Sequence, residues 1–178
     1  MTWMTRLASL VSLGLLVSGC SLPEQTRTAS GPSFTLTGES PIEAFDVTMC
    51  LNGPDPKKLF VHGRVNVAAT TNTGRDVTLR VESLERPEEE EDGVHVRELD
   101  LSGADEVETG FSLVANAMWK GSGERCADPE AVQFSVESLE PGEAVTVDWD
   151  VTMSVRWDDG SFGKGPDDSD LRIDIEQL

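Results

Sequence analysis

The sequence predicts an antiparallel, two-sheet β-sandwich over residues 34–178. The main observation is an alternation of apolar and polar residues with period two, which recurs from Phe34 to the C-terminus and is typical of half-buried strands. Turn-forming residues separate these runs, and no window has a convincing helical period of 3.6 residues. Short strands at this spacing, without intervening helices, favour an all-β fold.

Each predicted strand has one apolar face and one polar face. The clearest runs from Val145 to Trp157, where the odd-numbered residues are apolar and we expect them to face the core. In chain order, the runs are Phe45–Leu51, Leu59–Val67, Val77–Val81, Val94–Val96, Leu99–Leu101, Phe111–Trp119, Val132–Val136, Val145–Trp157 and Leu171–Ile175.

The connections between the runs are rich in glycine, proline, asparagine and aspartate. Examples are Asn52–Pro56, Thr73–Gly74, Gly121–Gly123, Pro141–Gly142 and Asp159–Gly160. Backbone reversal requires such residues, so each segment predicts a turn between neighbouring antiparallel strands. Two packed sheets are favoured, and a closed barrel is the main structural alternative.

One segment carries a looser resemblance. Residues Phe134–Trp149 read FSVESLEPGEAVTVDW and resemble a strand–turn–strand unit common in bacterial immunoglobulin-like surface domains. The resemblance implies an Ig-like sandwich, without indicating a particular family. Trp149 and Trp157 would then lie on the core face of the long strand.

The N-terminal residues resemble the signal of a bacterial lipoprotein. Arg6 precedes an apolar run from Leu7 to Val17, which as a helix would span roughly 16 Å, too short for a hydrocarbon layer of ~30 Å. The following residues, Val17-Ser18-Gly19-Cys20, are similar to a lipobox. In that family the cysteine thiol receives a diacylglyceryl group, the chain is cut before the cysteine, and the new amino terminus is often acylated by a fatty acid such as palmitate.

This resemblance implies a domain organisation and a location. Residues 1–19 would be a removed signal peptide, Cys20 the lipidated residue, and residues 20–33 a flexible tether, because that segment is polar and lacks apolar periodicity. The sandwich of residues 34–178 would be exported and anchored by lipid to the bacterial cell membrane or outer membrane. The alternative is an ordinary signal peptide in which Cys20 is incidental.

Two cysteines remain after Cys20. In an exported chain, Cys50 and Cys126 are most simply interpreted as one disulfide. Its long loop would stabilise the fold by roughly 4.5 kcal/mol in the chain-entropy model. The alternatives are two buried thiols or, less consistent with the spacing, a metal site, since neither cysteine has a second cysteine or histidine at zinc-ligand spacing.

The chain is strongly acidic, with a net charge of −19. That charge argues against a nucleic-acid partner. Acids crowd the last connection, where Asp158, Asp159, Asp168 and Asp170 are candidate calcium ligands. The segment lacks the EF-hand order, and the alternative is a solvated loop that keeps a β protein soluble. We therefore expect no metal site and no cofactor.

Catalytic motifs are also lacking. His62 and His95 each lie inside a predicted strand, no Gly-x-Ser-x-Gly turn is present, and the carboxylates of Asp148 and Asp150 are expected to point to solvent. The sequence predicts a non-catalytic binding or structural domain with an envelope protein or glycan as partner. The alternatives are a calcium-dependent carbohydrate-binding module and a hydrolase.

Overall fold

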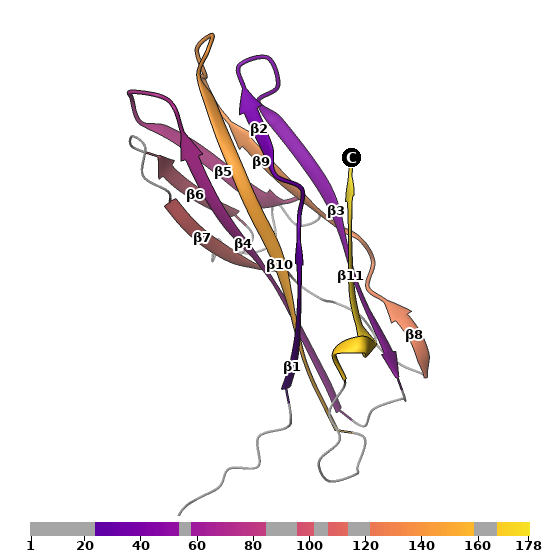
Figure 1. Ribbon diagram of the computed structural model, residues 1–178. Coiled ribbons are helices and arrows are strands. Elements are labelled where there is room, and N and C mark those ends of the chain that lie inside the picture. The colour runs from indigo at the N-terminus through magenta and orange to yellow at the C-terminus, as the bar shows by residue number, and fades with distance from the viewer. Residues whose placement is uncertain (1–23, 54–57, 85–95, 102–106, 114–121, 159–166) are drawn as a thin grey trace, which may run out of the picture.

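A computed structural model describes residues 24–53, 58–84, 96–101, 107–113, 122–158 and 167–178. These residues form two antiparallel sheets that pack face to face (Figure 1). Sheet A contains β1 (Glu24–Ser30), β2 (Phe34–Thr37), β10 (Ala144–Asp158), β4 (Lys58–Thr71) and β7 (Val107–Leu113). Sheet B contains β11 (Leu171–Gln177), β3 (Ile42–Gly53), β9 (Glu130–Val136), β5 (Val77–Ser83), β6 (Val96–Leu101) and β8 (Gly123–Cys126).

The predicted sandwich is confirmed. Within the described ranges the strands belong to two separate sheets, so the barrel alternative does not hold. A single 3₁₀ turn, η1 (Asp168–Asp170), precedes β11. Among these residues no helix has the length and apolar character needed to cross a bilayer.

The longest strand pairing joins β10 to β4. All 14 residues of β4 have a Cα partner on β10, from Lys58 opposite Asp158 to Thr71 opposite Val145. The prediction that the odd-numbered residues of β10 face the core is confirmed for the described side chains. Val145, Val147, Val151, Met153 and Val155 are each 0% exposed. The even-numbered residues of both strands therefore form the outer face of sheet A.

An aromatic cluster joins the sheets at the centre of the core. The indole of Trp149 from sheet A lies 5.0 Å from the ring of Phe45 and 5.2 Å from that of Phe134, both from sheet B. Phe34 of β2 packs against the same two rings. The indole Nε1 donates a hydrogen bond of 3.1 Å to the carbonyl oxygen of Pro32, which satisfies its only polar group.

The prediction of a flexible tether over residues 20–33 is wrong for Glu24–Ser30. Glu24–Ser30 form β1, which pairs with Arg156–Asp150 of β10. The sandwich therefore begins at β1 and not at residue 34. A polar edge strand needs no apolar face, because ladder hydrogen bonds with β10 hold it in place, and so its composition resembled that of a linker.

The disulfide prediction is confirmed. Cys50 of β3 and Cys126 of β8 are opposite each other in the register, with their Cα atoms 4.0 Å apart. The bond thus lies within sheet B, whereas the disulfide of antibody domains joins the two sheets. It fastens β8, which has only four residues and was not predicted, to a long central strand.

Gly31 lies directly against the indole of Trp149, which gives the first prediction. A Cβ atom at position 31 would lie 2.1 Å from Cε2 of the indole, so Gly31→Ala should displace the ring or the edge strand. We expect a loss of about 1–3 kcal/mol in the free energy of unfolding, as for other overpacked cores. Urea denaturation measures it, with Gly74→Ala as the control because no atom lies within 4 Å of that Cβ. Equal losses for both variants would contradict the packing described.

Candidate binding groove on sheet A

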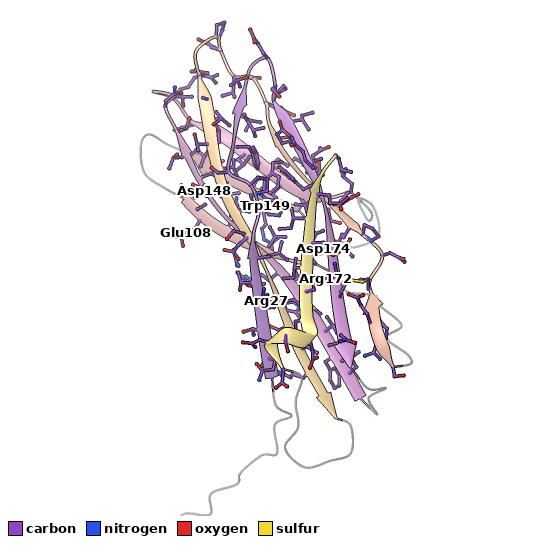
Figure 2. All side chains as sticks on the ribbon, turned by 45° about the vertical axis from the view of Figure 1, so that its right-hand side comes forward. Arg27, Glu108, Asp148, Trp149, Arg172 and Asp174 are labelled. Atoms are coloured by element: carbon purple, nitrogen blue, oxygen red, sulfur yellow. A yellow bond between two sulfur atoms is a disulfide. The ribbon has the colours of Figure 1, made fainter. Side chains whose placement is uncertain are left out.

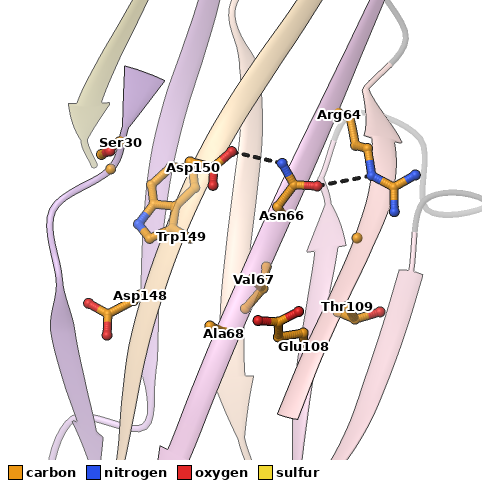
Figure 3. Close-up of a pocket in the computed structure, with 12 residues that line it drawn as sticks. Ser30, Arg64, Asn66, Val67, Ala68, Glu108, Thr109, Asp148, Trp149 and Asp150 are labelled. Atoms are coloured by element: carbon orange, nitrogen blue, oxygen red, sulfur yellow. Dashed lines mark hydrogen bonds between the residues drawn. The ribbon is translucent and has the colours of Figure 1, made fainter. Parts of the chain in front are cut away.

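The outer face of sheet A carries a polar groove with a volume of about 800 Å³ (Figure 3). Strand register places its side chains in rows across β10, β4 and β7. Asp150 is opposite Asn66, which is opposite Gly110. In the next row Ala68 lies between Asp148 and Glu108. These residues, together with Ser30, Gly31 and Arg64, line the groove.

Two small residues, Ala68 and Gly110, shape the groove. Ala68 places only a methyl group between Asp148 and Glu108. At Gly110, an added Cβ would lie 2.7 Å from Nη2 of Arg64 and 2.9 Å from the carbonyl oxygen of Val65. The Arg64 guanidinium therefore lies directly over Gly110, in space that any side chain there would fill.

Hydrogen bonds fix the side chains on one side of the groove. Arg64 Nε donates to Oδ1 of Asn66 at 3.0 Å, and Asn66 Nδ2 donates to Oδ1 of Asp150 at 2.7 Å. Both ends of the Asn66 amide are thus used, which sets its orientation. The network continues through Thr152, whose hydroxyl shares a 3.1 Å hydrogen bond with that of Thr28 on β1. The polar groups are held in place before any ligand arrives.

Four arginines outside the groove are neutralised by carboxylates. Arg75, Arg80, Arg156 and Arg172 form ion pairs with Glu143, Glu82, Glu24 and Glu124 at 2.6–2.8 Å. The hydrogen bond between Arg75 and Glu143 lowers the pKa of that carboxyl and raises the pKa of the guanidinium.

The groove differs in this respect. Arg64 has no ion pair with any residue that the structure describes, although the chain carries a net charge of −19. Asp148 and Glu108 likewise make no side-chain hydrogen bond or ion pair with any residue that the structure describes. Figure 2 shows these two acids to the left of the paired Arg172 and Asp174 of β11. Charged groups without protein partners therefore line the groove.

The other predicted site residues lie elsewhere. Cys20, Asp159 and the side chain of Asp158 are outside the described residues. Asp168 and Asp170 belong to η1, where Asp170 Oδ2 accepts a 3.0 Å hydrogen bond from the backbone of Asp167. In the described ranges, the only three potential ligand atoms that lie within 4.8 Å of one another belong to Cys50, Glu124 and Cys126. The sulfurs of this group are joined in the disulfide, so neither is a thiolate that could bind a metal.

Neither histidine is among the described residues that line the groove. His62 is exposed on β4, with Ser154 as its partner on β10, and it does not line the groove. His95 is outside the described residues. The groove lining contains the hydroxyls of Ser30 and Thr109 but no histidine that could act as their base.

The sequence located Asp148 and Asp150 on a polar strand face but did not identify the groove. Alternation reveals which residues face outward. It does not reveal that β4 and β7 place Asn66, Ala68 and Glu108 beside them, because those residues are far away in the chain.

Comparisons with known proteins identify no family. No protein-family model matches the chain, and no curated protein matches it. Among solved structures, the chain is similar to part of a family two carbohydrate esterase from Cellvibrio japonicus, at 10% identity and a TM-score of 0.34. The match covers 76% of this chain and 35% of the esterase chain, so this chain spans about a third of that protein's length. The groove is therefore the main evidence on function.

The geometry of η1 gives a prediction about calcium. Because the Asp170 carboxylate accepts a hydrogen bond from the backbone N–H of Asp167, millimolar calcium should raise the melting temperature no more than magnesium does at equal ionic strength. Differential scanning fluorimetry measures both shifts. A saturable, calcium-selective rise that Asp168→Asn abolishes would instead establish a calcium site at this connection.

Proposed function

We propose that this chain is a lipid-anchored, non-catalytic protein of the bacterial cell envelope that binds a neutral glycan in the groove of sheet A. One observation carries the proposal: Arg64, Asp148 and Glu108 line a groove without ion-pair partners in the described part, beside the preorganised Asn66 and Asp150. Ligand sites typically combine a concave surface with a few convergent polar groups.

The chemistry of the lining supports a glycan. The groove offers donors from Arg64 and acceptors from Asp148, Asp150 and Glu108, while the Asn66 amide holds Arg64 and Asp150 in place. A sugar hydroxyl both donates and accepts, so a neutral glycan can satisfy both kinds of group. A polyanion would meet three carboxylates and a chain of net charge −19, whereas an apolar ligand would leave the polar groups unsatisfied.

The absence of a histidine from the groove lining supports a role without catalysis. Hydrolytic chemistry by Ser30 would need a base within hydrogen-bond reach, and no hydrogen bond joins Ser30 to a described carboxylate, although Asp150 is its register partner on β10. Binding, by contrast, requires only the preorganised donors and acceptors.

The N-terminal residues support the proposed cellular location. Val17-Ser18-Gly19-Cys20 supports lipidation at Cys20 and anchoring to a membrane of the envelope. The Cys50–Cys126 disulfide is consistent with export, because such bonds persist mainly in oxidising compartments.

Binding of neutral oligosaccharides by the detergent-solubilised protein tests the groove. We expect isothermal titration with a panel of gluco-, manno- and chito-oligosaccharides to find a ligand that Asn66→Ala binds at least ~10-fold more weakly, equivalent to about 1.4 kcal/mol. That variant removes the amide between Arg64 and Asp150. Thr78→Ala is the control, since Thr78 is an exposed residue hydrogen-bonded to Asp100 on sheet B. Unchanged affinity in Asn66→Ala, or no binding by the wild type, would overturn the proposal.

Detergent phase partitioning tests the anchor separately. The wild-type protein should enter the detergent phase, and Cys20→Ala should leave an uncut or water-soluble form, because the acylated thiol is lost. Ser18→Ala keeps a small residue before the cysteine and should partition like the wild type. If Cys20→Ala partitions unchanged, the lipidation proposal is wrong.

A further inference from the structure

The start of β1 lies very close in sequence to the proposed lipid. Glu24 opens β1 and follows Cys20 by four positions. A fully extended chain spans at most ~3.6 Å per residue, so Glu24 lies within about 14 Å of Cys20 whatever the path between them. This inference rests on lipidation of Cys20. If Cys20 is at the level of the lipid headgroups, one end of sheet A must be near them too.

The register identifies that end. Glu24 is opposite Arg156 of β10, and Arg156 is opposite Phe60 of β4. We call these three residues the basal row. In Figure 1 the start of β1 lies at the lower end of the sandwich, whereas β2 and the connection between β9 and β10 lie at the upper end.

The basal row differs from the rest of the outer face of sheet A. Phe60 is 61% exposed, while the outward positions that follow it on β4 are His62, Arg64 and Asn66. Arg156 donates two hydrogen bonds to Oε2 of Glu24, at 2.9 Å and 2.6 Å. This pair cancels two charges and ties the first residue of β1 to β10. In a chain of net charge −19, the row combines an exposed aromatic ring with no net charge.

We propose that the basal row lies against the membrane surface, with the Phe60 ring among the lipid headgroups. Phenylalanine is among the side chains that bury into the boundary between headgroups and acyl chains, and a neutral ion pair is cheaper to bring near it than either charge alone. The exposed acids Asp167 and Asp168 are the N-cap and the first residue of η1, which contacts β1 and β3. Repulsion from anionic lipids would tip this acidic side away and the Phe60 side toward the surface.

This orientation leaves the groove accessible. Asp150 lies six positions from Arg156 along β10, about 20 Å at the rise of a strand. The groove would then face sideways above the headgroups, where a glycan strand of the envelope can pass along it.

Site-specific fluorescence in vesicles tests the orientation. Phe60→Cys is labelled with the environment-sensitive dye NBD in the mature lipidated protein, which is reconstituted into vesicles of phosphatidylcholine and anionic phosphatidylglycerol that contain doxyl-labelled lipid. Cys50 and Cys126 are joined in the disulfide and do not react with the label. Glu140→Cys is the matched control, because Glu140 is exposed in the connection between β9 and β10 at the far end. We expect at least twofold quenching at position 60 and almost none at position 140.

Two further measurements test the orientation and the anchor separately. Insertion of ten Gly/Ser residues between Pro23 and Glu24 should reduce the quenching at position 60, because a long linker releases the end from the surface. Vesicle flotation separates the two proposals. A protein that fails to float overturns the anchor and the orientation together, whereas one that floats with equal quenching at positions 60 and 140, or with none at 60, overturns the orientation alone.

Discussion

The pairing of β10 with β4 is the constraint on which the rest of the structure depends. It runs the full length of β4 and assigns every residue of both strands to the core or to the outer face. Trp149 points inward to Phe45 and Phe134, and its neighbour Asp150 points outward to Asn66. A slip of one residue would exchange the two sets, placing carboxylates in the core. Core and groove are thus two consequences of one register.

Trp149 also connects the edge of sheet A to the core. Its indole reaches under Gly31, and its Nε1 bonds to Pro32, in the short break between β1 and β2. The two short strands therefore continue along one side of β10, with a bend where the ring needs space. The same break places Ser30 and Gly31 at the rim of the groove, so packing inside the sandwich shapes the proposed binding surface.

The sequence was sufficient to predict the features that depend on local pattern. Alternation identified the inward residues of β10, and the expectation of export, together with two remaining cysteines, led to the Cys50–Cys126 bond. The edge strand β1 was missed because its stability comes from backbone hydrogen bonds to β10, which leave no trace in its polar composition. The groove was missed because it requires the register between strands more than 80 positions apart, such as that of Asn66 and Asp150.

The central claim is that the outer face of sheet A binds a glycan. The most direct measurement is a titration of the ¹⁵N-labelled protein in detergent micelles with a neutral oligosaccharide, followed by heteronuclear NMR. The account predicts that the side-chain resonances of Asn66 Nδ2 and Arg64 Nε, with backbone amides of β4 and β10 around them, shift saturably while sheet B stays unchanged. Shifts confined to sheet B, or no shifts at saturating oligosaccharide, would contradict it.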